Sequence, residues 1–133
     1  GYLNPAATST IAGKNFIIQN VYINTYTSGA TMGANPTLFQ WSLGVGGTSA
    51  SLLEVDSVTG GTRAPRRIGL GCQSIAATAA AGSLANRPIS FESPVPLLVE
   101  PGTYMHVILK MPLGNATASL VYRGNVTING YFE

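Results

Sequence analysis

The alternation of side chains near the C-terminus constrains the fold more than any other feature of the sequence. From Tyr104 to Met111 every odd position is apolar, whereas His106 and Lys110 fall on the other parity. From Leu120 to Phe132 every even position is apolar or glycine. A period of two is typical of β-strands that bury one face. Since Pro112–Asn115 has the chemistry of a turn, this part of the chain predicts two strands separated by a turn.

The remainder of the chain contains further segments that are rich in β-branched and aromatic residues. Glycine- and proline-rich turns separate them. We therefore expect an all-β fold of about eight strands, an antiparallel β-sandwich that is jelly-roll-like, the jelly roll being the commonest eight-stranded form. The further strands are predicted over Asn15–Tyr26, Leu38–Val45, Ser49–Val55, Arg67–Gln73 and Ile89–Val99.

Three segments depart from regular alternation. Asn15–Tyr26 has apolar residues on both parities, so either a bulge near Gln19-Asn20 exchanges the faces or both faces are covered. Pro94 and Pro96 cannot donate to a ladder, which predicts that this half of their strand lies at an edge or a bend. Ser74–Pro88 is predicted to be a loop with at most one or two helical turns.

Length and composition indicate a single domain that is covered by other proteins. A chain of 133 residues predicts one domain, with residues 1–14 as an N-terminal arm or edge segment and 15–133 as the sandwich. Charged residues make up 9 % of the chain, against roughly 25 % in an ordinary soluble domain. The mean hydropathy is +0.24. A surface so poor in charge suits packing against other protein copies better than it suits a free monomer.

The ionisable residues predict no catalytic or metal site. Glu54 and Asp56 share a strand face, but a glycosidase needs two carboxylates across a cleft, and we interpret them as a solvated strand end. His106 has no second histidine or cysteine cluster with which to share a metal, and we expect it at the surface or in an interface. Cys72 alternates with apolar neighbours, which predicts an inert core thiol. We therefore expect no enzyme activity and no cofactor.

Charge and hydropathy also narrow the class of partner. Arg63, Arg66 and Arg67 form the only charge cluster, and the net charge is +2. Binding to nucleic acid would need a wider basic stripe with stacking aromatic residues, so we predict none. Ion pairing with an acidic patch on a neighbouring subunit, or with Glu54 or Asp56, is the alternative use. No apolar run approaches the roughly 20 residues that span a bilayer, so we expect no membrane partner.

Four phrases resemble small structural proteins of tailed bacteriophages. They are FQWSLGVGGTSASL (39–52), APRRIGLGCQSIAA (64–77), PLLVEPGTYMHVILKM (96–111) and RGNVTINGYFE (123–133). The strand opened by Pro-Gly and the final strand with its aromatic–aromatic–acid ending are similar to virion surface jelly rolls. The resemblance spans roughly residues 38–133. It implies a capsid decoration (cement) protein or a comparable head or tail surface module, trimeric and without catalytic residues.

The resulting hypothesis is a virion structural protein that contacts other copies and the major capsid protein. The alternative is a carbohydrate- or receptor-binding module of a tail fibre or secreted protein, in which exposed tyrosines such as Tyr2, Tyr26, Tyr104 or Tyr131 stack on sugars. A shell-forming coat subunit is disfavoured, because no strongly basic arm is present to neutralise nucleic acid. The candidate contact residues are Tyr2, Leu3, Ile11, Phe16, Ile18, Tyr22, Arg63, Arg66 and Arg67.

Overall fold

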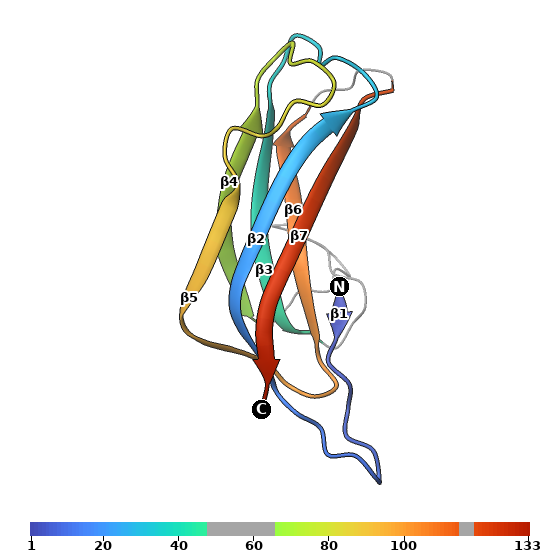
Figure 1. Cartoon of the computed structure of the whole chain (residues 1–133), viewed down its shortest axis with the longest axis vertical. Coiled ribbons are helices and arrows are strands. Elements are labelled where there is room, and N and C mark those ends of the chain that lie inside the picture. The colour runs from blue at the N-terminus through green and yellow to red at the C-terminus, as the bar shows by residue number, and fades with distance from the viewer. Residues whose placement is uncertain (48–65, 115–118) are drawn as a thin grey trace, which may run out of the picture.

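The computed structural model describes residues 1–47, 66–114 and 119–133, and this part consists of strands, turns and loops. Residues 4–14 loop out at the lower end in Figure 1, between the short first strand and the second strand. The strands are β1 (Tyr2–Leu3), β2 (Phe16–Ser28), β3 (Thr37–Gly47), β4 (Arg66–Ile75), β5 (Ile89–Val99), β6 (Tyr104–Leu113) and β7 (Val121–Phe132).

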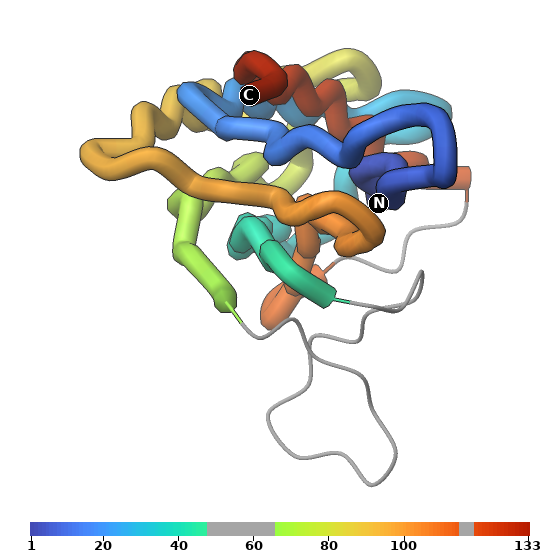
Figure 2. The backbone as a smooth tube through the Cα atoms, turned by 90° about the horizontal axis from the view of Figure 1, so that it is seen from below, coloured from blue at the N-terminus to red at the C-terminus, as the bar shows by residue number. Residues whose placement is uncertain are grey.

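The strands form two antiparallel sheets that pack as a β-sandwich (Figure 2). One sheet has the order β1-β6-β3-β4 and the other the order β5-β2-β7. The pairings of the long strands are nested along the sequence: β2 pairs with β7, and β3 and β6, which lie between them in the chain, pair with each other. The prediction of an all-β antiparallel sandwich is confirmed. The predicted strand over Ser49–Val55 lies outside the described residues.

The core lies between the sheets and follows the predicted alternation. On β3, Phe39, Leu43 and Val45 are at most 1 % exposed, and Trp41 is 7 % exposed. From the other sheet, Val21 and Ile23 of β2 face them and are fully buried. Burying a side chain of this size contributes about 1.5–3 kcal/mol each. These residues are therefore the main source of stability in a chain whose single cysteine is free.

A bulge explains the poor alternation of β2. Its register against both neighbours shifts between Ile18 and Asn20, so the predicted bulge is confirmed. Ile18 lies in the core before the bulge, and Val21 lies in the core after it. Since the extra residue exchanges the parity, Tyr22 turns to the outer face and is 43 % exposed.

A second bulge makes the prediction for Cys72 wrong. The register of β4 against β3 shifts where Leu70 lies between the paired Gly69 and Gly71. Gly71 has a φ of 139°, a backbone conformation that glycine adopts more readily than other residues. Leu70 still faces the core, but the parity changes after it, so Cys72 is exposed and Gln73 is buried.

The prediction for the two prolines is confirmed, and the predicted loop before them is confirmed except for its first two residues. In β5, Glu92 pairs with Asn20 and Leu97 pairs with Ile18, so residues 93–96, with both prolines, leave the ladder at the edge of the sheet. Of the predicted loop Ser74–Pro88, Ser74 and Ile75 belong to the end of β4, and residues 76–88 form turns and a single bridge between Leu84 and Tyr26.

Candidate functional site

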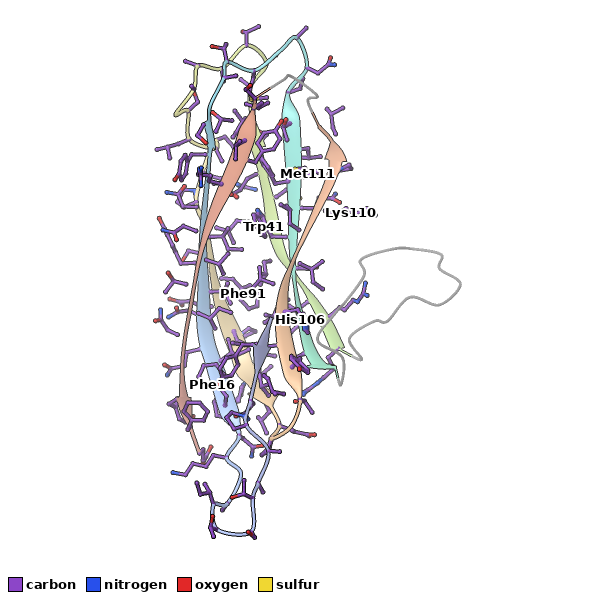
Figure 3. All side chains as sticks on the ribbon, turned by 90° about the vertical axis from the view of Figure 1, so that its right-hand side faces the viewer. Phe16, Trp41, Phe91, His106, Lys110 and Met111 are labelled. Carbon is purple, nitrogen blue, oxygen red and sulfur yellow. The ribbon has the colours of Figure 1, made fainter. Side chains whose placement is uncertain are left out.

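Exposed apolar side chains gather along one side of the sandwich, which we call the open side. It comprises the arm, β1, β6 and β7, and Figure 3 is viewed from this side. Met111, labelled there, is 43 % exposed. The other large exposed apolar residues on this side are Tyr2, Leu3, Ile11, Leu109, Leu113, Val126 and Phe132, whereas Val121 and Tyr131 of β7 lie on the outer face of its sheet.

The two sheets leave a cleft on the open side. A cavity of about 220 Å³ lies between them, lined by Gly1 and Tyr2, by Met105 and Val107 of β6, and by Val126 and Ile128 of β7. The cleft exists because β1 is only two residues long and pairs with Tyr104 and Met105 alone. Apolar side chains that face inward on β6 and β7 are therefore left partly in contact with solvent.

Aromatic rings continue this surface toward the arm. The rings of Tyr2 and Phe16 lie 6.0 Å apart, and those of Phe16 and Phe132 lie 5.1 Å apart, both in tilted arrangements. Phe132 also lines a hollow of about 170 Å³ with Ile11 of the arm. Ile11 is 68 % exposed and Phe132 is 51 % exposed. The arm and the end of β7 thus present one apolar corner.

Asn4 fastens the arm to the sandwich. Its side chain is 1 % exposed, and Nδ2 donates to the carbonyls of Lys14 and Val99, both at 2.7 Å. Its backbone N–H donates to the carbonyl of Thr103, and its own carbonyl accepts from the N–H of Gly102. A single buried amide therefore joins both ends of the arm to the turn between β5 and β6.

We expect Asn4→Ala to lower the free energy of unfolding by about 1–3 kcal/mol, because the buried carbonyls of Lys14 and Val99 lose their donor. Urea denaturation measures this loss, and proteolysis after Lys14 should accelerate. Thr8→Ala is the control, since the Thr8 hydroxyl bonds only within the arm and should change stability by less than about 0.5 kcal/mol. Equal effects of the two substitutions would contradict the anchoring role.

The structure brings some of the predicted contact residues together and separates others. Tyr2, Ile11 and Phe16 lie on the open side, and Leu3 lies beside them, 44 % exposed. Tyr22 lies on the outer face of the sheet β5-β2-β7.

The remaining candidates do not contribute to the open side. Ile18 is 1 % exposed and belongs to the core, so it offers no surface for contact. Arg66 is at the start of β4, on the opposite side of the sandwich, where its guanidinium donates to the carbonyl of Leu98 at 2.7 Å. Arg67 follows it and is partly buried. Arg63, like Glu54 and Asp56, lies outside the described residues.

The expected surface position of His106 is wrong. The side chain is 7 % exposed, because β1 adds to the edge of β6 at this point. A Cβ atom on Gly1 would come within 2.7 Å of the His106 Nε2 atom, so the chain's own first residue covers the imidazole. The ring also lies 5.5 Å from that of Tyr104. Periodicity within β6 alone could not reveal this cover, since it comes from the other end of the sequence.

Sequence reasoning missed several residues that line the cleft of the open side. The alternation predicts inward faces for Val107, Val126 and Ile128. They do face inward, but they line the cleft. The sequence pattern does not show the strand order, so it could not reveal that β7 lies at a sheet edge or that only the short β1 lies outside β6.

A further hollow, of about 420 Å³, lies on the outer face of the β5-β2-β7 sheet. It is formed where the β2 bulge meets residues 93–96, which leave the ladder of β5. Its lining includes Asn20, Glu92, Ser93 and Tyr131, and the Tyr131 side chain is 47 % exposed. Asn129 lies beside it and donates from Nδ2 to the Asn20 Oδ1 atom at 2.7 Å. The hollow therefore combines one aromatic face with amide and carboxylate groups.

No metal site or membrane span emerges from the part of the chain that the structure describes. Within it, no three histidine, cysteine, aspartate or glutamate side chains lie close enough to share a metal ion. It also contains no helix of the length and hydropathy needed to cross a bilayer. Comparison of the chain with protein-family models, curated proteins and solved structures gave no match.

Proposed function

We propose that this chain is a non-enzymatic structural protein of a virion, which decorates and stabilises the surface of a phage capsid. It would do so through contacts with other copies of itself and with the major capsid protein. The observation that carries the proposal is the open side, where Tyr2, Ile11, Val126 and Phe132 are each 38–68 % exposed on a chain with 9 % charged residues. The resemblance to phage surface jelly rolls supports the virion setting.

The stabilising mechanism follows from burial. Apolar surface removed from water contributes about 25 cal/mol per Å², and a specific interface buries about 800 Å² on each partner. A protein that binds only the assembled particle shifts the particle toward its intact form by mass action. Such a decoration protein needs a surface for contact and no catalytic group.

The test is co-sedimentation with particles from cells that produce this chain. Ile11→Asp should reduce the bound fraction at least about tenfold, because a charge at the centre of an apolar contact must be desolvated. Leu84→Asp is the matched control, since Leu84 is 64 % exposed but lies in the loop before β5, and it should bind as the unchanged chain does. Particles without the chain, or equal binding by both variants, would overturn the proposal.

The hollow at Tyr131 favours a second candidate function, binding of a glycan receptor. A tyrosine ring can stack on the apolar face of a sugar while Glu92 and Asn20 accept or donate hydrogen bonds to its hydroxyls. Screening against a glycan array, with Tyr131→Ala beside the unchanged chain, tests it. A hit that the substitution abolishes supports this function, and an array without hits rejects it.

A further inference from the structure

The edges of the two sheets differ in how their free backbone groups are protected. An unprotected edge strand presents a row of N–H and C=O groups that can pair with another chain, and proteins protect such edges with prolines, bulges, lysines or covering segments. In β5, Pro94 and Pro96 lie in the excursion that interrupts the ladder. In β6, the edge is partly covered by β1, and Lys110 and Pro112 follow.

The edge of β4 is closed by side chains and backbone of the following loop. Asn86 bonds both backbone groups of Ser74, with its side-chain Oδ1 accepting from the N–H at 2.9 Å and its own N–H donating to the carbonyl at 2.8 Å. The Arg87 Nε atom lies 3.4 Å from the carbonyl of Cys72, to which it donates. The bulge at Leu70 breaks the remaining regularity of this edge.

The edge of β7 has none of these devices. The strand runs for 12 residues without proline, lysine or a bulge of its own, and no other described segment pairs with its outer side. It also forms one wall of the apolar cleft, through Val126 and Ile128. Of the edges that the structure describes, this is the one left ready for another strand.

The hydrogen-bonding phase of β7 is fixed by Glu133, the residue that follows the strand. Asn15 and Glu133 exchange both backbone hydrogen bonds, each at 2.9 Å, so the N–H and C=O of Glu133 point toward β2. Because bonded and non-bonded residues alternate along an antiparallel strand, the odd residues of β7 bond to β2. The even residues, Gly124, Val126 and Ile128 among them, direct their backbone groups to the free edge.

We propose that β7 pairs antiparallel with β7 of a second copy, about a two-fold axis at Ile128. In this register the even residues form the hydrogen-bonded pairs. Arg123, the only basic residue of the strand, lies opposite Glu133 of the other copy, at a non-bonded position where side chains come closest. In either neighbouring register that keeps the even residues hydrogen-bonded, Arg123 no longer lies opposite Glu133.

The same register also matches large side chains with glycines. Phe132 lies opposite Gly124, and Val126 lies opposite Gly130 of the other copy. Gly124 has no side chain above Trp41, and a Cβ atom there would stand 3.2 Å from the indole ring. The incoming Phe132 therefore settles beside Trp41, and the two clefts join into one apolar layer. The two-fold symmetry makes each of these matches occur twice.

This pairing rests on the proposed assembly function and adds one specific contact between copies. The pairing can be disproved while the decoration of particles still holds. The test is sedimentation equilibrium of the full chain over a wide concentration range. The unchanged chain should dimerise. Arg123→Glu and Glu133→Arg should each raise the dissociation constant at least about tenfold, since each replaces two attractive pairs with two repulsive ones. The double variant should return to within about threefold of the unchanged chain.

Two further variants separate pairing from general charge and folding effects. Glu92→Arg makes the same charge change on the proline-bearing edge and should leave dimerisation unchanged. Val126→Pro removes a backbone donor that faces outward, so it spares the bonds to β2, and it should give a folded monomer by circular dichroism. A monomer or a trimer in the unchanged chain, or a double variant that fails to restore the dimer, overturns the strand pairing. Co-sedimentation with particles despite that result would leave the decoration function standing.

Discussion

Gly130→Ala is expected to lower the free energy of unfolding by about 3 kcal/mol, although it adds only one methyl group. A Cβ atom at this position would overlap the Ile17 carbonyl oxygen, and it would lie 2.8 Å from the Phe16 ring. The β2 bulge that follows Ile18 brings that carbonyl against β7. Because the clash is with backbone, neither strand can relieve it by a rotamer change, and overpacking of this kind costs about 1–3 kcal/mol or more. Urea denaturation measures the loss.

Gly69→Ala is the matched control, because it is also a strand glycine. Among the residues that the structure describes, none but its neighbours in the chain comes within 4 Å of a Cβ atom at Gly69. The added methyl group reduces the freedom of the unfolded chain, so stability should change by less than about 1 kcal/mol, or rise. If both alanine variants unfold at the same urea concentration as the unchanged chain, the close approach of β2 and β7 at Gly130 is not present in solution.

Gln73→Leu is expected to lower the free energy of unfolding by about 3–5 kcal/mol, although it changes the side-chain volume little. Gln73 is 1 % exposed. Its Oε1 accepts from Thr25 Oγ1 at 2.8 Å and from Trp41 Nε1 at 2.9 Å. Its Nε2 donates to the carbonyl of Arg87 at 2.6 Å. Leucine fills the space but leaves these buried groups unpaired, at about 1–3 kcal/mol each when they cannot relax.

Denaturation followed by Trp41 fluorescence measures this effect, because the indole N–H is one of the groups that loses its partner. Gln40→Leu makes the same change on the exposed outer face of β3 and should shift stability by less than about 0.5 kcal/mol. An equal loss in the two variants would show that the buried network does not connect β3, β4 and the loop before β5 as described.

The alternation that predicted the sandwich is a local property, and it succeeded where the chain is locally regular. The inward face of β3, with Trp41 at its centre, was predicted correctly because every second residue is large and apolar. In β2 the mixed parity indicated a bulge before the pairing was known. In β4 the apolar residues alternate cleanly up to Cys72, so nothing in the apolar pattern showed that the extra residue at Leu70 exchanges the faces after it.

The candidate site could be predicted only in part, because an edge is defined by which strands pair. Pro94 and Pro96 marked β5 as an edge or bend, since proline cannot donate. β7 carries no such mark, and its regular alternation reads like that of a strand inside a sheet. That Val126 lines an open cleft, and that Gly1 covers His106, depends on contacts between the two ends of the chain.

Amide hydrogen exchange along β7 tests most directly whether the open side is an assembly surface. The odd residues bond to β2 and should be protected at every protein concentration. The N–H groups of Gly124, Val126 and Ile128 face outward, and their protection should rise with concentration until it matches that of their odd neighbours. Exchange of these three amides at the rate of exposed groups, at all concentrations and on particles alike, would contradict the proposal that another protein covers this side.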